Sequence, residues 1–158
     1  MSLAIVPGSF DPMTLGHLEL VRAVAQKYDE VVVAVMQNAE KQYLFTTEER
    51  VEIAKRTVGE LSNVKVISDD GMLIDLFDRL DASAVCKGVR NEADLAYENR
   101  MANWNKEHNP RFVTELITSE GIYANVSSTD VRNAMKEGKD LSCLVHPDVI
   151  FILSQKTI

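Results

Sequence analysis

Short apolar runs alternate with longer amphipathic segments along the whole chain. Five runs rich in valine and isoleucine predict β-strands at residues 3–6, 31–35, 64–67, 84–86 and 112–117. Four of the five are short and nearly continuous in apolar residues, which is typical of strands that are buried on both faces. The pattern therefore favours a parallel sheet that is covered by helices on each side.

Between these runs, apolar residues recur at the three- and four-residue spacing of a helix. The segment "MLIDLFDRL", residues 72–80, predicts one such helix. Three stripes predict further helices, the last of them weaker and more polar: Leu18, Val21, Ala25 and Tyr28; Val51, Ala54, Val58 and Leu61; and Leu95, Asn99, Ala102 and Lys106.

Residues that start helices stand at the expected places. Thr46 precedes Glu49 by three residues, which is the capping-box spacing, and Ser127 precedes Asp130 in the same way. Pro147 fits the first turn of a last helix. The order of elements predicts a single α/β domain over residues 1–158. We expect a doubly wound, Rossmann-like domain with a five-stranded parallel sheet and helices on both faces.

Composition excludes several classes of protein. With 158 residues, 46% of them hydrophobic, the chain is expected to fold around one core. No apolar stretch is as long as a membrane span, and the N-terminus lacks the basic start of a signal peptide, which predicts a cytoplasmic protein without membrane contact. The net charge of −7 disfavours nucleic acid as a partner. Cys86 and Cys143 are too few for a disulfide framework, and both are interpreted as buried apolar residues.

The segment "VPGSFDPMTLGH", residues 6–17, carries the strongest chemical signal. It follows the first predicted strand, at the carboxyl edge of the sheet, where ligands bind in doubly wound folds. Thr14 is placed to cap the next helix, which puts Gly16 and His17 in a first turn whose free N–H groups favour a phosphate. The positive end of the helix opposes protonation of His17, so a neutral hydrogen-bond donor is expected. The alternative is a plain turn with a surface histidine.

Within this segment, "SFDPMTLGH" resembles the Thr-x-Gly-His form of the His-x-Gly-His signature of the nucleotidyltransferase superfamily. The longer "PGSFDPMTLGH" is similar to the first motif of the bacterial phosphopantetheine adenylyltransferase family. Three later stretches resemble that family in order and spacing: "EKQYLFTTEER", "VCKGVRNEADLAYENRMANWN" and "YANVSSTDVR". By this resemblance, which covers essentially the whole chain, the sequence is identified as a member of the family.

The resemblance implies an enzyme of coenzyme A biosynthesis. It would transfer AMP reversibly from ATP to 4′-phosphopantetheine, giving dephospho-coenzyme A and pyrophosphate. Direct in-line attack needs no covalent enzyme intermediate, so the protein would supply positioning and positive charge. Mg²⁺ is expected to arrive with ATP, and no metal site of the protein's own is predicted because carboxylates do not cluster. The resemblance also implies a homohexamer and leaves feedback binding of coenzyme A open.

The resemblance also assigns roles to single residues. The catalytic residues would be His17, as hydrogen-bond donor to the α-phosphate, with Lys41 and Arg90. The phosphopantetheine site would consist of Ser9, Lys41, Leu73 and Lys87. The ATP site would be the largest set: Ser9, Phe10, His17, Gly88, Val89, Arg90, Glu98, Tyr123, Ala124, Asn125, Val126, Ser127, Ser128 and Thr129.

One position departs from the family pattern. Lys87 stands where the family usually has arginine, and lysine keeps the charge but loses the planar two-pronged contact with phosphate. Lys41, Lys87, Arg90 and Arg132 are together predicted to form a cationic pocket, and Asp11 is interpreted as a turn residue that bonds its own backbone. Two alternatives stay open. One is a related nucleotidyltransferase acting on nicotinamide mononucleotide or glycerol phosphate, and the other is a nucleotide-binding regulatory module without catalysis.

Overall fold

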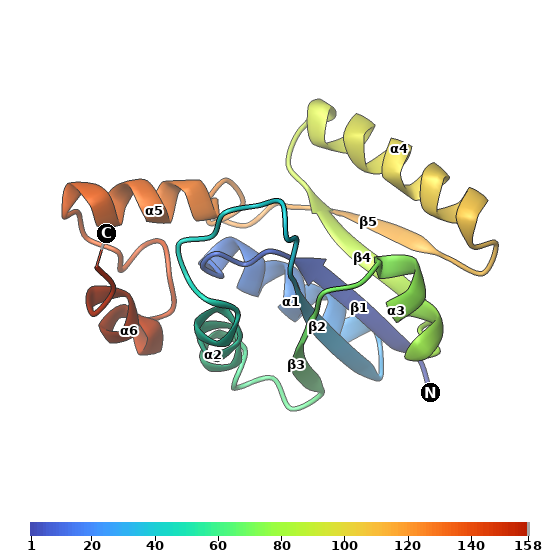
Figure 1. The fold of residues 1–158 in the computed structure, drawn as a ribbon, viewed down its shortest axis with the longest axis horizontal. Coiled ribbons are helices and arrows are strands. Elements are labelled where there is room, and N and C mark those ends of the chain that lie inside the picture. The colour runs from blue at the N-terminus through green and yellow to red at the C-terminus, as the bar shows by residue number, and fades with distance from the viewer. Residues whose placement is uncertain (158) are drawn as a thin grey trace.

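The structure is a computed structural model that describes residues 1–157 of the chain. Its strands form one parallel sheet in the order β3-β2-β1-β4-β5 (Figure 1). They are β1 (Leu3–Gly8), β2 (Glu30–Met36), β3 (Val64–Asp69), β4 (Ala84–Val89) and β5 (Thr114–Thr118). The predicted five-stranded parallel sheet is confirmed. The chain reverses its direction of winding between β1 and β4, which is where doubly wound folds bind ligands.

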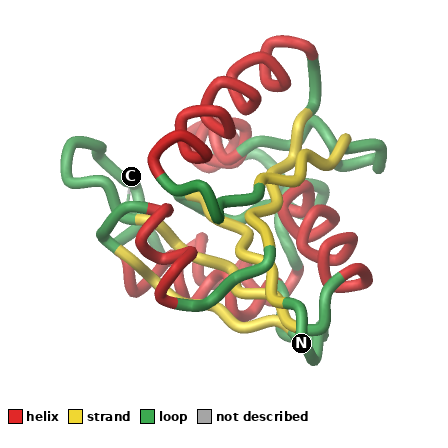
Figure 2. Tube along the Cα trace, turned by 90° about the vertical axis from the view of Figure 1, so that its right-hand side faces the viewer, coloured by secondary structure: helices red, strands yellow, loops and turns green. Residues whose placement is uncertain are grey.

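Helices cover both faces of the sheet (Figure 2). They are α1 (Leu15–Lys27), α2 (Thr47–Thr57), α3 (Leu73–Arg79), α4 (Glu92–His108), α5 (Ser128–Glu137) and α6 (Ile150–Ser154), and a 3₁₀ turn, η1 (Pro147–Val149), leads into α6. The capping boxes predicted at Thr46 and Ser127 are present, and Thr14 caps α1 in the same way. The predicted domain extends to residue 158, which lies outside the described residues.

Alternate residues of β1 contribute to two hydrophobic cores. Ala4 and Val6 belong to the core that α1 and α2 complete, whereas Ile5 packs into a second core with Leu76 and Phe77 of α3. All five side chains are almost fully buried. Because strands of this sheet are buried on both faces, their apolar runs are continuous, and their carboxyl ends meet at one edge.

The apolar stripe predicted for α4 is wrong. Leu95 is exposed, whereas the buried residues of the helix are the polar Glu98 and Asn105. The inward face of α4 lines polar as well as apolar space, so the spacing of apolar residues does not mark it. The sequence pattern therefore predicts that this helix exists, but not which of its faces is buried.

Two smaller expectations also differ from the structure. The last strand begins at Thr114, because Phe112 is buried in the preceding turn, where its N–H donates to the carbonyl of Asn109. Cys143 is exposed in a turn after α5, although Cys86 is buried as predicted.

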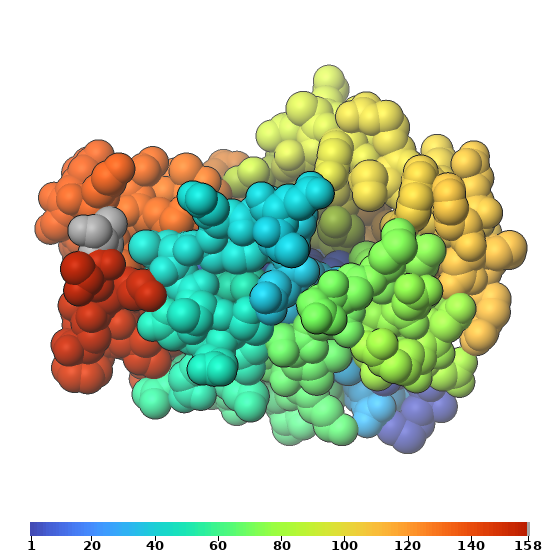
Figure 3. Space-filling view, viewed as in Figure 1, coloured from blue at the N-terminus to red at the C-terminus, as the bar shows by residue number. Residues whose placement is uncertain are grey.

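The loops that follow β1, β2 and β4 open on the same edge of the sheet. The surface is hollowed there between the loop after β2, the start of α3 and the region of α4 (Figure 3). Within residues 1–157, no helix has both the length and the apolar character required to cross a membrane.

Candidate functional site

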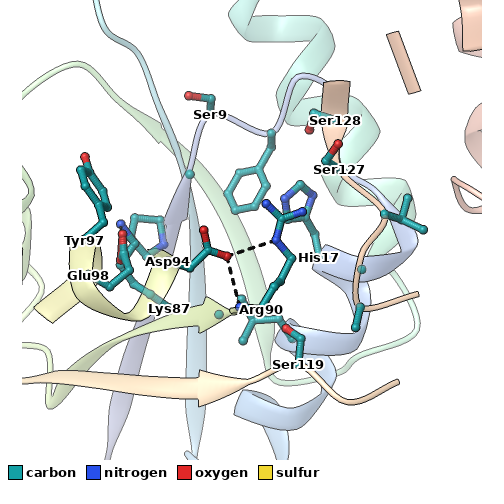
Figure 4. A pocket seen from close by; sticks show the side chains of 18 residues that line it. Ser9, His17, Lys87, Arg90, Asp94, Tyr97, Glu98, Ser119, Ser127 and Ser128 are labelled. Atoms are coloured by element: carbon teal, nitrogen blue, oxygen red, sulfur yellow. Dashed lines mark hydrogen bonds and ion pairs between the residues drawn. The ribbon is translucent and has the colours of Figure 1, made fainter. Parts of the chain in front are cut away.

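A cavity of about 390 Å³ opens at the carboxyl ends of β1 and β4 (Figure 4). Three parts of the chain form its wall: the turn from β1 into α1, the end of β4 with the start of α4, and the segment that leads into α5. Its lining residues are Pro7, Gly8, Ser9, Phe10, Gly16, His17, Leu20, Lys87, Gly88, Arg90, Asp94, Tyr97, Glu98, Ser119, Ala124, Val126, Ser127 and Ser128. We call it the nucleotide cavity below.

The turn from β1 into α1 fixes the imidazole of His17. The main-chain N–H of Thr14 donates to Nδ1 of His17 over 3.0 Å, and the N–H of His17 donates back to Oγ1 of Thr14 over 3.2 Å. Burial, followed by the nearby Arg90 guanidinium, lowers the pKa of His17 to about 4. Since Nδ1 accepts a hydrogen bond and the ring is neutral, its proton is on Nε2. His17 therefore offers a single N–H donor to the cavity.

Phe10 stabilises the same imidazole from the side. Its ring meets the ring of His17 edge-on, with centroids 5.0 Å apart and planes at 87°. To reach this place, Phe10 has a φ of 48°, which a residue with a side chain rarely adopts. Such backbone strain costs about 1 kcal/mol or more and concentrates at functional sites.

On the opposite wall, two cations of β4 and its following loop pair with carboxylates of α4. Nε of Arg90 lies 3.3 Å from Oδ2 of Asp94, and Figure 4 shows the guanidinium directed toward His17. Nζ of Lys87 lies 3.0 Å from Oε2 of Glu98, whose side chain is buried. Each cation therefore has an acidic partner before any anion enters the cavity.

Two further cavities adjoin the first. An apolar cavity of about 310 Å³ lies between β4, α3 and α4 and is lined by Met72, Leu73, Val85, Lys87, Glu98, Met101, Ala102, Trp104, Asn105 and Thr114. A polar cavity of about 490 Å³ lies beneath the loop after β2 and includes Ser9, Lys41, Leu73 and Lys87. Lys87 is the residue that lines all three cavities.

The loop that carries Lys41 is joined to the turn after β1. Asp11 is almost fully buried, and its two carboxylate oxygens accept the N–H groups of Leu44 and Phe45 over 2.9 Å each. The interpretation of Asp11 as a turn residue bonding its own backbone is therefore wrong, since its partners lie more than thirty residues away. Nζ of Lys41 lies 3.5 Å from Oγ of Ser9.

The N-terminus of α5 completes the wall. Oγ of Ser127 accepts the N–H of Asp130 over 3.1 Å, and Oγ of Ser128 donates to the carbonyl of Pro12 over 2.7 Å. Both hydroxyl groups are thus engaged within the protein. The first-turn N–H groups of a helix have no acceptor within it, so this end of α5 favours an anion.

Most of the predicted site residues meet at these three cavities. Leu73 lines the second and third cavities and Lys41 lines the third, whereas the other predicted residues that line a cavity line the first. Four residues predicted for the ATP site lie outside the cavity walls, and their part in ATP binding stays a prediction: Val89, Tyr123, Asn125 and Thr129. The side chain of Val89 is buried at the end of β4, although Lys87, two residues before it on the strand, lines the cavity.

The predicted place of Arg132 in the cationic pocket is wrong. Its Nη1 donates to the carbonyl of Asp11 over 2.7 Å, and its Nη2 donates to Oγ1 of Thr129 over 3.0 Å. It therefore joins α5 to the turn after β1. Lys41, Lys87 and Arg90 are the predicted cations that do line the cavities.

Sequence reasoning missed several lining residues. Asp94 follows Arg90 by four residues and pairs with it, but Arg90 precedes the first residue of α4, so the helical spacing of ion pairs did not indicate this contact. Met101, Trp104 and Asn105 on α4 gave no signal either, because they belong to a face with no apolar periodicity.

The chain is similar to known nucleotidyltransferases over most of its length. It matches the cytidylyltransferase-like family over residues 5–134. It is 38% identical over 150 residues to the phosphopantetheine adenylyltransferase of Clostridium beijerinckii, which covers 95% of this chain and 94% of that protein. The enzymes of the same name from Clostridium kluyveri and Heliobacterium modesticaldum are each 38% identical over 156 residues, covering 99% of this chain and 95% and 93% of theirs.

The chain belongs to the phosphopantetheine adenylyltransferase family. The resemblance drawn from its four motifs is thereby confirmed, and the protein is an adenylyltransferase. A solved structure of a candidate nicotinate-nucleotide adenylyltransferase from Vibrio parahaemolyticus matches with a TM-score of 0.72 at 20% identity, covering 98% of this chain and 100% of that one. At this identity the match supports the fold of the family, not a choice of substrate.

Proposed function

We propose that this adenylyltransferase transfers AMP from ATP to 4′-phosphopantetheine, reversibly, and so makes dephospho-coenzyme A and pyrophosphate in coenzyme A biosynthesis. The names of three relatives that match nearly the whole chain support this acceptor. The observation that carries the proposal is the position of Lys87 at the junction of a polar cavity with His17, an apolar cavity with Leu73 and a third cavity with Lys41. A substrate with a phosphate at one end of a long uncharged arm fits this junction.

The reaction requires positioning and charge stabilisation. An oxygen of the acceptor phosphate forms a bond to the α-phosphorus of ATP, while the bond from that phosphorus to the bridging oxygen breaks and its electron pair leaves with pyrophosphate. The acceptor phosphate is already ionised, so no base is needed. Negative charge grows on the outer oxygens of the α-phosphate, and Nε2–H of His17 and the guanidinium of Arg90 are the groups that stabilise it.

The acceptor phosphate would lie between Ser9, Lys41 and Lys87. Nζ of Lys41 and Oγ of Ser9 already face each other at 3.5 Å. Lys87 is held by Glu98 at 3.0 Å, so a bound phosphate shares or replaces that carboxylate. The arm would extend past Leu73 into the apolar cavity beside Met101.

Mg²⁺ would enter with ATP. Residues 1–157 contain no group of three or more His, Cys, Asp or Glu side chains arranged to hold a metal ion, and the two carboxylates that line the nucleotide cavity, Asp94 and Glu98, are already paired with cations. The metal would therefore be bound mainly by phosphate and water, where it neutralises charge on the leaving pyrophosphate. We also propose, from family resemblance, a cytoplasmic homohexamer with coenzyme A as a feedback ligand.

Pyrophosphate release tests the acceptor. The enzyme is incubated with MgATP and, in separate reactions, 4′-phosphopantetheine, nicotinamide mononucleotide and glycerol 3-phosphate. Release with 4′-phosphopantetheine alone is the expected result. Release with either other acceptor alone contradicts the proposal and selects a different nucleotidyltransferase, and ATP binding without release in any reaction selects a regulatory module.

A further inference from the structure

The segment between β5 and α5 forms one wall of the nucleotide cavity without being packed into the core. Ser119, Ala124 and Val126 line the cavity, but no residue from 119 to 126 is buried. Two turns shape it internally: the N–H of Ala124 donates to the carbonyl of Gly121, and the N–H of Val126 donates to that of Tyr123. Apolar burial therefore does not determine where this wall lies.

The first two turns of α1 provide the missing attachment. Oγ1 of Thr14 donates to the carbonyl of Val126 over 3.3 Å, and Oε1 of Glu19 accepts the N–H of Tyr123 over 2.9 Å. A Cβ at Gly16 would lie only 2.7 Å from the carbonyl oxygen of Tyr123, so the segment rests directly on the helix. Gly16 and Glu19 are three residues apart and share one helix face.

Gly121 is required by the same contact. A Cβ on this residue would overlap the carboxylate of Glu19, which occupies the space beside the Gly121 main chain. A methyl group there would displace the end of a flexible side chain rather than backbone, so it would expel the carboxylate from its bond to Tyr123. The glycine and the glutamate are thus a matched pair, joined across more than a hundred residues of sequence.

We propose that Glu19 is a positioning residue for the nucleotide. Its carboxylate fixes residues 121–126 on α1, the helix that carries His17, and so holds the wall formed by Ala124 and Val126 at a set distance from the imidazole. Glu19 does not line the nucleotide cavity and acts only through the segment. The inference rests on the proposed function in one respect, namely that this cavity binds ATP.

Loss of the Glu19 contact should change the affinity for ATP but not the affinity for the acceptor phosphate. Loss of the Glu19 contact leaves the Tyr123 N–H without its charged acceptor and lets the segment move, at a cost of about tenfold in affinity for ATP. The Ser9 and Lys41 region is built from other loops, so binding of the acceptor phosphate should not change.

The first test compares Glu19→Ala with Glu19→Gln. Isothermal titration calorimetry with MgATP should show about tenfold weaker binding for Glu19→Ala and at most about threefold for Glu19→Gln, because the amide keeps an acceptor oxygen. Amide hydrogen exchange of residues 121–126 should rise in the alanine variant alone. Glu120→Ala removes an equal charge from an exposed neighbour and is the control, with unchanged ATP affinity expected.

The second test uses a double-mutant cycle. Gly121→Ala should weaken ATP binding as Glu19→Ala does, and the combined variant should be no weaker than either one, because each change removes the same contact. Additive losses in the double variant would overturn the proposal. So would equal ATP affinity and equal exchange in Glu19→Ala and the unmodified enzyme.

The two proposals fail in different ways. If the unmodified enzyme binds ATP but releases no pyrophosphate with 4′-phosphopantetheine, the proposed function is wrong while the Glu19 tests still apply. If the steady-state KM for ATP and that for 4′-phosphopantetheine rise together in Glu19→Ala, the residue supports the whole fold and not the nucleotide wall. A thermal melt of each variant shows whether it is folded before these comparisons are made.

Discussion

The two sides of the nucleotide cavity are built in different ways. On the α1 side, the contacts are short and made largely to main-chain atoms: Thr14 holds His17, Phe10 packs against its ring, and Asp11 binds the loop after β2. On the α4 side, Arg90 and Lys87 are held by side-chain ion pairs with Asp94 and Glu98. Both partners of the Arg90–Asp94 pair are partly exposed, and such ion pairs are weak and exchange easily, whereas in the Lys87–Glu98 pair only Lys87 is partly exposed.

This difference indicates that the two sides of the cavity have different roles in the reaction. The α1 side is arranged in advance for a charge that appears only in the transition state, which is the condition for accelerating the chemical step. On the α4 side, Lys87 would bind charge that the acceptor phosphate brings with it, and Glu98 neutralises this cation until a phosphate arrives. Loss of the His17 donor should therefore alter kcat, and loss of Lys87 should alter KM.

The largest expected effect is that of His17→Ala. Removing the Nε2–H donor should lower kcat about a thousandfold while the affinity for ATP stays nearly unchanged, because the contact is made in the transition state. Single-turnover kinetics with MgATP and 4′-phosphopantetheine measure the chemical step. His108→Ala, on the exposed end of α4, is the control and should keep kcat. A fall of less than tenfold in His17→Ala would reduce the residue to a helix cap.

A smaller effect, on the other side, is expected for Lys87→Ala. The KM for 4′-phosphopantetheine should rise about tenfold or more, since a charged hydrogen bond to phosphate is lost, and the KM for ATP should change far less. Lys87→Arg restores the charge and adds a two-pronged donor, so it should recover most of the loss. Equal rises in both KM values on steady-state assay would remove Lys87 from the acceptor site.

The smallest expected effects come from removing the N-cap threonine of α1 or of α2, both of which belong to capping boxes. Thr14→Ala and Thr46→Ala should each lower the free energy of unfolding by about 1 kcal/mol, as measured by urea denaturation. Only Thr14→Ala should also lower kcat, by several-fold, because Oγ1 of Thr14 contacts both His17 and the carbonyl of Val126. An equal kcat in the two variants would show that the cap of α1 has no part in orienting the imidazole.

The sequence was sufficient for features that depend on local pattern. Continuous apolar runs predicted the strands of a doubly buried sheet, and the Thr46–Glu49 and Ser127–Asp130 spacings predicted caps that the structure contains. Thr14 and His17 were also predictable, because a strand followed by a capped helix turn determines where both lie. These signals span only a few residues of chain.

Contacts between distant polar residues were not predictable from such patterns. Asp11 accepts hydrogen bonds from main-chain N–H groups in the loop after β2, and Glu19 accepts one from the main-chain N–H of Tyr123. In neither case does the spacing of residues in the sequence indicate the partner. Arg50 is similar: it is almost fully buried in α2, where its guanidinium donates to the carbonyl of Ser9 over 2.9 Å. Polar residues are normally exposed, so periodicity places them on the wrong face.

The protonation state of His17 is the property on which the account most depends. Nδ1 accepts the Thr14 N–H, and burial lowers the pKa to about 4, so above this pH the ring is neutral with its proton on Nε2. A lowered pKa means that acid protonates the imidazole only near pH 4, whereas a free histidine takes up its proton near about pH 6.5. Donation to the α-phosphate should therefore persist through the mildly acidic range.

Nitrogen-15 NMR of the imidazole across a pH titration tests this claim most directly. The predicted result is a single neutral form from pH 8 to about pH 5, with Nε2 protonated and Nδ1 unprotonated, and a transition near the pKa of about 4. A transition near the free-histidine value, or a proton on Nδ1 at neutral pH, would contradict the assignment of His17 as the prearranged donor.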